Sequence, residues 1–197
     1  ERWGIHAFTV GSVFGGLLAA RNFAICFGDR MLAERYGQAA EEVREGFKKH
    51  MWSEDHGRYL RRIEPVQTDR ISQLIDLATS GRDPRTANGF TDDTVEMYRD
   101  AVIDSSLFGI YKFQLLDTND PKVAATMEAV EKRLRVRTTV GGYARYEEDT
   151  YHRVTDNVAD VPGNPWHICT LWMADWKIAR AKTVKQLHEA LPIVQWV

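Results

Sequence analysis

The sequence is poor in cysteine, nearly neutral in net charge and without a long unbroken hydrophobic run. Two cysteines in 197 residues cannot form a disulfide framework. Because Cys26 and Cys169 both lie in apolar, helix-like stretches, we predict that they are buried thiols. A formal net charge of -2 gives no electrostatic preference for nucleic acid or a membrane surface. No stretch reaches the length of about 20 apolar residues that a transmembrane helix needs, so we expect no membrane partner.

The motifs of several enzyme classes are missing as well. The sequence contains no phosphate-binding loop, no dinucleotide fingerprint and no arrangement that activates a serine or cysteine nucleophile. His152 and His167 lack neighbours with the spacing of zinc ligands, so we predict no metal site, no cofactor and no nucleic-acid partner. The chain begins at Glu1 rather than Met. We therefore expect a piece of a longer protein, whose compartment stays open with the cytoplasm favoured over secretion.

What the sequence does contain is a regular alternation of apolar and amphipathic segments. The composition, 44% hydrophobic and 27% charged, is that of an ordinary globular domain. After a short connection, each apolar segment is followed by one with a charged outer face, as in antiparallel helical hairpins. The predicted helices lie within residues 1–27, 31–52 (with a turn at 37–38), 101–116, 122–134, 166–180 and 183–197. The sequence thus predicts an all-α fold of about three hairpins, each with an inner and an outer helix.

The region between the first two hairpins is irregular. Residues 58–63 have the weak alternation of a short strand, which fits a short β-hairpin, and residues 69–78 are predicted to be helical. Residues 80–93 are rich in Gly, Pro, Asn and Asp, which is typical of a loop. The sharpest local signal comes later, where Asp120 precedes Pro121. Asp is a preferred cap and Pro a preferred first residue, so a helix is expected to begin here.

A dense polar and aromatic cluster opens the stretch from Gly141 to Trp176. Its first motif is Arg-Tyr-Glu-Glu-Asp-Thr-Tyr at residues 145–151, and its second is Gly-Asn-Pro-Trp-His-Ile-Cys-Thr-Leu at residues 163–171. Aromatic rings stack on the apolar faces of a pyranose, while Arg and Asp make paired hydrogen bonds with vicinal hydroxyls. The cluster therefore indicates a sugar-binding loop, against the alternative of a solvated turn with ion pairs.

Taken together, the two motifs resemble those of the family 15 glycoside hydrolases, the glucoamylase family, where a similar sugar-binding loop precedes a barrel helix. Residues 153–161 separate the motifs here, whereas they nearly abut in shorter members. That family folds as an (α/α)6 toroid of six helical hairpins. The resemblance implies that residues 1–197 are a fragment of a single glucoamylase-like catalytic domain, a partial toroid that corresponds roughly to its C-terminal half.

The same resemblance implies which positions bind and which react. Inverting hydrolysis needs a carboxylic acid and a carboxylate base about 6.5 to 9.5 Å apart. The acid is expected immediately before Glu1 and the base after Val197, so this chain is expected to lack both. Glu1 matches a substrate-binding carboxylate. Arg145 and Asp149 match the pair that grips sugar hydroxyls, and Trp166 matches a subsite aromatic.

The implied activity is inverting hydrolysis of α-glucosidic bonds, which releases glucose from the non-reducing ends of an α-glucan or oligosaccharide; the linkage stays open. One alternative is a non-catalytic carbohydrate-binding or regulatory domain, and another is a self-sufficient hydrolase that uses Asp104 or Glu148. Glu147 and Glu148 are otherwise expected to be cap or surface residues, and His6 is either a core histidine or a sugar contact. Because a half toroid exposes inner helices, we expect self-association or a complex with the remainder of the barrel.

Overall fold

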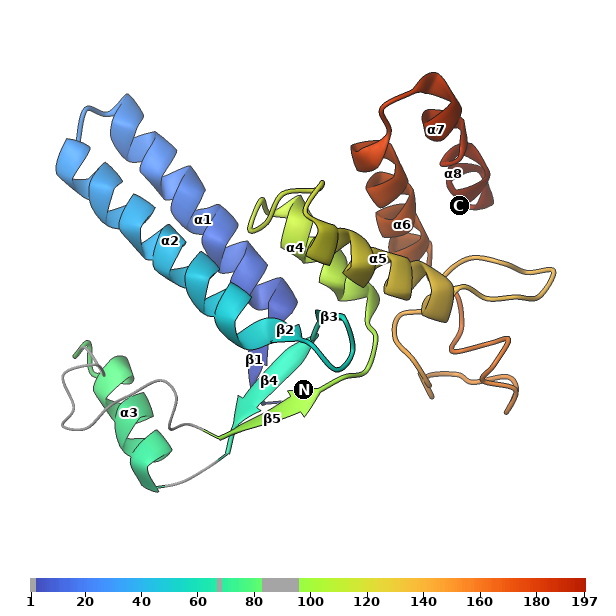
Figure 1. Cartoon of the computed structure of the whole chain (residues 1–197), viewed down its shortest axis with the longest axis horizontal. Coiled ribbons are helices and arrows are strands. Elements are labelled where there is room, and N and C mark those ends of the chain that lie inside the picture. The colour runs from blue at the N-terminus through green and yellow to red at the C-terminus, as the bar shows by residue number, and fades with distance from the viewer. Residues whose placement is uncertain (1–2, 67–68, 83–95) are drawn as a thin grey trace.

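Helices form most of the chain, as predicted, and a few strands are added to them (Figure 1). The computed structural model describes residues 3–66, 69–82 and 96–197. Glu1 and most of the loop predicted at residues 80–93 therefore lie outside the described residues.

The first hairpin joins α1 (Ala7–Cys26) to α2 (Arg30–Met51). Asp29 starts α2, because its side chain accepts a hydrogen bond of 2.9 Å from the backbone N–H three residues later. Phe14 of α1 and Ala40 of α2 are both fully buried in the main hydrophobic core. The inner and outer helices predicted here are confirmed, with bounds close to those expected.

The predicted turn at residues 37–38 is wrong, since α2 runs through it without a break. A Cβ atom on Gly37 would lie 3.3 Å from Cδ of Arg21 in α1. The glycine therefore gives room for a side chain of the neighbouring helix, and the contacts along the hairpin outweigh its low helix propensity.

The helix predicted over residues 101–116 is too long. Only η3, a 3-10 helix (Ser105–Phe108), and the short α4 (Gly109–Lys112) form there. Asp104 is extended, with φ -140° and ψ 134°, and its side chain caps η3. Gln114 has φ 62°, a left-handed conformation that stops the helix soon after α4. Both η3 and α4 pack against α1, and η3 also packs against α5 and α6.

The start of α5 (Pro121–Leu134) follows the local signal closely. The side chain of Asp120 accepts hydrogen bonds from the N–H groups of Lys122 at 2.7 Å and Val123 at 3.4 Å. Pro121 occupies the first turn, where its missing N–H costs no hydrogen bond. The predicted cap and outer helix of the second hairpin are therefore confirmed.

The third hairpin begins with α6 (His167–Arg180), whose predicted bounds are confirmed within one residue. Its outer partner, predicted as one helix over residues 183–197, is instead divided into α7 (Val184–His188) and α8 (Leu191–Trp196). Pro192 explains the division, because it has no N–H to donate to the carbonyl four residues earlier.

Within the described residues the strands form two small antiparallel sheets. The first contains β1 (Ile5–His6), β4 (Arg62–Pro65) and β5 (Met97–Asp100), in the order β1-β4-β5. The second is a hairpin of β2 (Trp52–Ser53) and β3 (Arg58–Tyr59).

The single strand predicted at residues 58–63 covers β3 and the beginning of β4, and the expected β-hairpin is present. β1 and β5 were not predicted, because their partner β4 is far away in the sequence and pairs Ile5 with Ile63. Next to this sheet, α3 (Asp69–Thr79) confirms the short helix predicted there.

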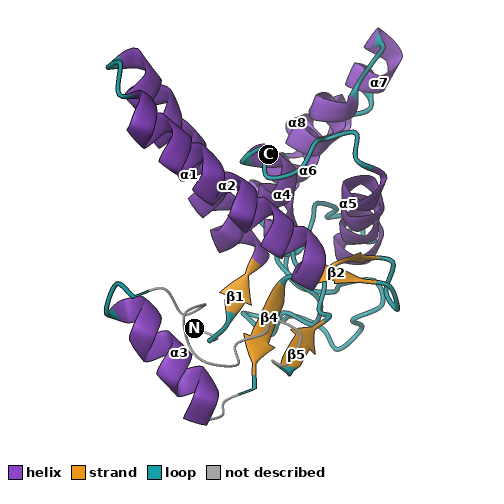
Figure 2. Cartoon of the chain, turned by 60° about the vertical axis from the view of Figure 1, so that its left-hand side comes forward, coloured by secondary structure: helices purple, strands orange, loops and turns teal. Residues whose placement is uncertain are grey.

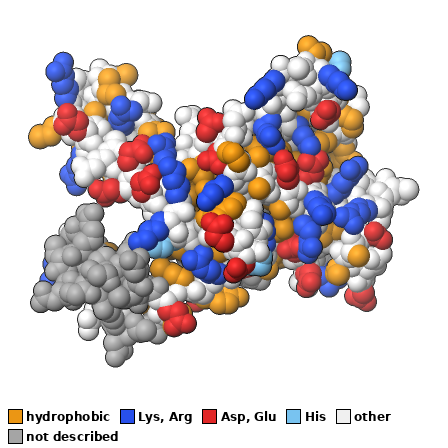
Figure 3. Space-filling model, in the orientation of Figure 1, with side chains coloured by type: hydrophobic (Ala, Val, Ile, Leu, Met, Phe, Trp, Pro, Cys, Tyr) orange, Lys and Arg blue, Asp and Glu red, His pale blue; other side chains and the backbone are white. Residues whose placement is uncertain are grey.

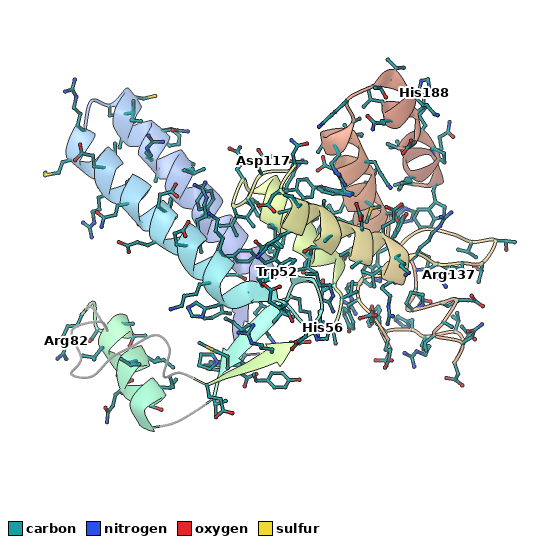
Figure 4. All side chains as sticks on the ribbon, viewed as in Figure 1. Trp52, His56, Arg82, Asp117, Arg137 and His188 are labelled. Carbon is teal, nitrogen blue, oxygen red and sulfur yellow. The ribbon has the colours of Figure 1, made fainter. Side chains whose placement is uncertain are left out.

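The three hairpins diverge above the first sheet, and the beginnings of α1, η3 and α6 lie toward the same side of the molecule (Figures 1 and 2). Asp117, in the connection between α4 and α5, and His188, the last residue of α7, lie at the opposite side (Figure 4). The loop that carries the two sequence motifs runs along the first of these sides, where the inner helices begin.

The two cysteines have different surroundings. Cys169 is buried, as predicted, and burial raises the pKa of its thiol, which keeps it in the unreactive protonated form. Cys26 is exposed, so the prediction of a buried thiol is wrong there. It is the last residue of α1, at the tip of a hairpin that projects from the molecule (Figure 1). Both cysteines are free.

The expectation that no segment has spanning length is also corrected. By length and composition α1 is sufficiently apolar to cross a membrane, and little of it is buried against the rest of the described chain. The core helix of a globular protein meets the same criterion. Hydrophobic side chains are exposed at the tip of the first hairpin, among charged ones (Figure 3). The exposed apolar side chains of α1 and α6 include Val13, Phe23, Ile25, Ile168, Leu171 and Ile178.

We predict that the isolated 197-residue chain self-associates at micromolar concentration, because these apolar faces drive burial in a partner. Sedimentation velocity would then show dimers or larger species. Phe27 and Met31, which are 84% and 81% exposed at the hairpin tip, serve as a local comparison. Replacing both with Lys removes only the apolar surface of the hairpin tip. Association should then fall only in part, because the apolar faces of α1 and α6 remain exposed. A sharp monomer for the unmodified chain would contradict the prediction.

Candidate functional site

Residues 141–166 form a loop whose backbone is tied to two inner helices. The N–H of Trp166, at the start of α6, donates to the carbonyl of Tyr143 at 3.0 Å. The N–H of Ser105, the first residue of η3, donates to the carbonyl of Arg145 at 2.8 Å. The backbone at Arg145 is therefore fixed between the beginnings of η3 and α6.

The segment 153–161 does not separate the two motifs in space. The N–H of Asp149 donates to the carbonyl of Pro162 at 3.0 Å, which closes the base of this insertion. The side-chain amide of Asn164 adds hydrogen bonds to the carbonyls of Tyr151 and His152, at 3.2 and 2.6 Å. The inserted residues leave the loop and return to it, and the motif on each side keeps its contact with the other.

Gly163 is required for this closure. A Cβ atom at this position would lie 2.7 Å from Cβ of Asp149, closer than real Cβ contacts allow. Gly142 serves the other end of the loop, with φ +79° and a contact with Trp196 that leaves no space for a side chain. These two glycines allow the loop to fold back against itself and against α8.

The centre of the loop is a bidentate ion pair. Nε and Nη2 of Arg145 donate to the two carboxylate oxygens of Asp149, each at 2.9 Å. Asp149 is 1% exposed and Arg145 is 36% exposed, so the carboxylate is inside and the guanidinium reaches the surface. Burial alone would raise the pKa of Asp149, but hydrogen bonds from Arg145 and from the N–H of Tyr151 hold it below the ordinary value.

Three aromatic rings surround the Arg145 guanidinium. Its Cζ lies 4.7 Å from the ring centre of Tyr146, 5.0 Å from that of Trp166 and 5.5 Å from that of Tyr151. The rings of Tyr151 and Trp166 are themselves 5.8 Å apart. Arg145 Nη1 has no hydrogen-bond partner among the described residues, so the group presents one donor nitrogen between aromatic faces.

The structure thus brings together three of the four predicted site residues, Arg145, Asp149 and Trp166; Glu1 lies outside the described residues. No individual role was predicted for Tyr146 or Tyr151, although both belong to the first motif. Their place in the first motif was the available signal.

The two neighbouring glutamates behave as expected for structural residues. Glu147 accepts a 2.8 Å hydrogen bond from the N–H of Ile103 and pairs with Arg133, which ties the loop to the segment before η3. Glu148 is exposed, with φ 57°. His152 and His167 lie at the surface, and the described part of the chain holds no group of three or more His, Cys, Asp or Glu that is suited to a metal ion.

A small cavity of about 180 Å³ lies directly beside this loop, lined by His6, Arg61, Asp104 and Tyr146. A larger hollow of about 740 Å³ lies between α5, α6 and α8 and is lined by the first three residues of the loop, 141–143. The larger one includes none of the guanidinium-facing rings, so we place the candidate site at the inner-helix beginnings, around Arg145 and the smaller cavity.

Comparison with known proteins decides the family. The family model described as glycosyl hydrolases family 15 matches residues 1–195, which is nearly the whole chain. The chain belongs to glycosyl hydrolase family 15. An uncharacterized glycosyl hydrolase of Methanocaldococcus jannaschii is 27% identical over 187 residues, which are 94% of this chain and 23% of that protein.

Two solved glucoamylase structures have a similar fold. A bacterial glucoamylase complexed with acarbose matches with a TM-score of 0.63 and 16% identity, over 96% of this chain and 27% of that one. The glucoamylase from Saccharomycopsis fibuligera matches with a TM-score of 0.53 and 18% identity, over 90% of this chain and 33% of that one. The helical hairpins are therefore a part of an (α/α)6 barrel. The chain spans about a quarter to a third of the length of the relatives it matches.

We predict that Arg145→Met raises the pKa of Asp149 above the ordinary value of an aspartate, because burial then acts without the ion pair. In the unmodified chain the depressed pKa stabilises the fold above the pKa of the unfolded state. That stability is lost as the pH falls through the folded pKa. A carbon-13 NMR titration of the Asp149 carboxyl, in the unmodified chain and in Arg145→Met, measures the two pKa values.

Arg133→Met is the matched control, since Arg133 is largely exposed and pairs with Glu147 instead. It should leave the Asp149 titration unchanged. An unaltered Asp149 pKa in Arg145→Met would show that the pair does not control this carboxylate.

Proposed function

We propose that this chain supplies the sugar-binding side of the active site of a glucoamylase-type glycosidase. The enzyme releases glucose from the non-reducing ends of α-glucans by inverting hydrolysis. The observation that carries the proposal is the Arg145 guanidinium, fixed by Asp149 and facing Tyr151 and Trp166 at the beginning of an inner helix. Family membership and the fold agree with it.

The geometry suits a neutral, polyhydroxylated ring. Two of the three guanidinium nitrogens of Arg145 are held by Asp149, so the side chain is already ordered before a ligand arrives. The third nitrogen, Nη1, is available to donate to a hydroxyl oxygen. The rings of Tyr151 and Trp166 provide apolar faces against which the C–H groups of a pyranose pack. Each part matches one surface of a sugar.

We place the reacting carboxyl groups in the residues that flank this chain, the acid immediately before Glu1 and the base after Val197. A single-displacement mechanism needs the acid to protonate the leaving oxygen and the base to activate a water on the other face of the sugar. In this proposal residues 1–197 belong to one catalytic domain, and Arg145, Asp149 and Trp166 bind and orient the substrate for those groups.

An α-glucan is the proposed substrate class. Support comes from one of the matched structures, a bacterial glucoamylase complexed with acarbose. The charge of the Arg145 and Asp149 pair is balanced, which favours a neutral ligand over an ionic one.

The test is glucose release from maltooligosaccharides by the 197-residue chain, beside a version extended at both ends by the flanking residues of its gene. We predict activity in the extended protein alone. Equal activity in both would overturn the placement of the acid and base and return attention to carboxylates such as Asp104 and Glu148. Glucan binding without activity in either would favour the non-catalytic carbohydrate-binding domain.

Within the extended protein, Arg145→Lys tests the binding role. Lysine keeps the charge but loses the paired hydrogen bonds and the planar group between the rings, so kcat/KM should fall by about tenfold to a hundredfold. Lys122→Arg, at the far side of α5, is a control that should leave kcat/KM unchanged.

A further inference from the structure

The cavity beside the Arg145 loop draws its walls from four separate parts of the chain. His6 ends β1 and precedes α1, Arg61 precedes β4, Asp104 caps η3, and Tyr146 belongs to the loop. The beginnings of two inner helices and the loop before a third therefore meet there. At about 180 Å³ the cavity is smaller than the roughly 300 to 1,000 Å³ of sites that enclose drug-sized ligands, which suits one monosaccharide unit.

Arg61 is held rigidly in the cavity wall. Its Nε donates to Oδ2 of Asp100 at 3.0 Å, and its Nη2 lies 2.9 Å from the same oxygen. Both residues are buried, and Asp100 is further fixed by Arg62 and by the N–H of Val102. Two nitrogens of Arg61 thus face the buried Asp100, and the third, Nη1, faces Asp104.

The pairing between Arg61 and Asp104 is loose by comparison. Nη1 of Arg61 and Oδ2 of Asp104 are 3.3 Å apart, whereas charge-assisted hydrogen bonds of this type are commonly about 2.7 to 2.9 Å. The other oxygen of Asp104 accepts from the N–H of Ser106 at 2.9 Å, which fixes the carboxylate. Asp104 remains 17% exposed. A hydroxyl group that enters can donate to Oδ2 and accept from Nη1.

The two ion pairs beside Tyr146 therefore differ. Arg145 and Asp149 are joined by two hydrogen bonds of 2.9 Å each. Arg61 and Asp104 are joined by a single, longer one of 3.3 Å. The ring of Tyr146 stands between them, 4.7 Å from Cζ of Arg145 and 5.6 Å from Cζ of Arg61. A saccharide that reaches across this ring would contact both.

We propose that the cavity lined by His6, Arg61, Asp104 and Tyr146 is a second sugar subsite, which takes one neutral monosaccharide unit of the chain bound at Arg145. Asp104 and Arg61 bind its hydroxyls, and Tyr146 separates the two subsites. This inference rests on the proposed function, since it extends the same binding site by one unit.

The test is isothermal titration of the extended protein with maltotriose, using Asp104→Asn. In every sample the expected catalytic acid before Glu1 is replaced by its amide, so that maltotriose binds without being hydrolysed. Asparagine can still cap η3 through its side-chain oxygen, but it puts an amide in place of the carboxylate that faces Arg61. We predict that the affinity for maltotriose falls by about tenfold to a hundredfold. Asp120→Asn is the matched control, because Asp120 caps α5 in the same way and lines no part of this cavity; its affinity should equal that of the unmodified protein.

A second measurement needs no substitution in the cavity. With the original cavity residues and the same amide before Glu1, the carbon-bound ring protons of His6 should shift in NMR spectra as maltotriose is added, because His6 lines the cavity. Unchanged affinity in Asp104→Asn, or an unmoved His6 signal at saturation, would overturn the second subsite. In either case, observed binding of maltotriose would still support the proposed function. Absence of any maltotriose binding by the unmodified protein would overturn both.

Discussion

The arrangement of the candidate site depends on the ion pair between Arg145 and Asp149. A nearly buried carboxylate is stable only when a positive charge and hydrogen bonds compensate for its lost hydration, and here Arg145 and the N–H of Tyr151 supply them. The pair in turn orients the guanidinium between aromatic rings. Gly163 leaves the space that Asp149 occupies in this pair, because any side chain at residue 163 would collide with Asp149. Removing the pair would therefore disturb the loop and the binding surface together.

The position of this loop follows from the hairpin architecture. The inner helices α1, η3 and α6 all begin on the side of the molecule where the loop runs, and the small sheet holds the entry into α1 there (Figure 1). Residues remote in sequence, from His6 to Trp166, are thus gathered at one end of the hairpins. In the proposed function this end of the partial (α/α)6 barrel binds the sugar, while the exposed faces of α1 leave space for further packing.

Local signals in the sequence predicted local structure at some positions and not at others, since the cap at Asp120 formed and the turn at residues 37–38 did not. The cap at Asp120 and the two motifs of the loop act over a few residues, so their outcome depends little on the rest of the chain. Non-local features were missed: the pairing of Ile5 with Ile63 joins strands far apart in sequence, and the exposure of Cys26 depends on where the hairpin tip projects. The cavity at Asp104 could not be predicted from the sequence for the same reason, because four separate segments of the chain form its walls.

The most direct test of the sugar-binding account is an indole nitrogen-15 NMR titration with maltotriose. The extended protein carries an amide in place of the expected acid before Glu1, so that the ligand is not hydrolysed. The chain contains six tryptophans, and the account predicts a saturable shift for Trp166, which faces Arg145. Trp176, buried in the core against Tyr111, and Trp52, beside Lys122, should stay unmoved. No shift at Trp166 under saturating maltotriose, or shifts confined to Trp52 and Trp176, would contradict the placement of the sugar at this loop.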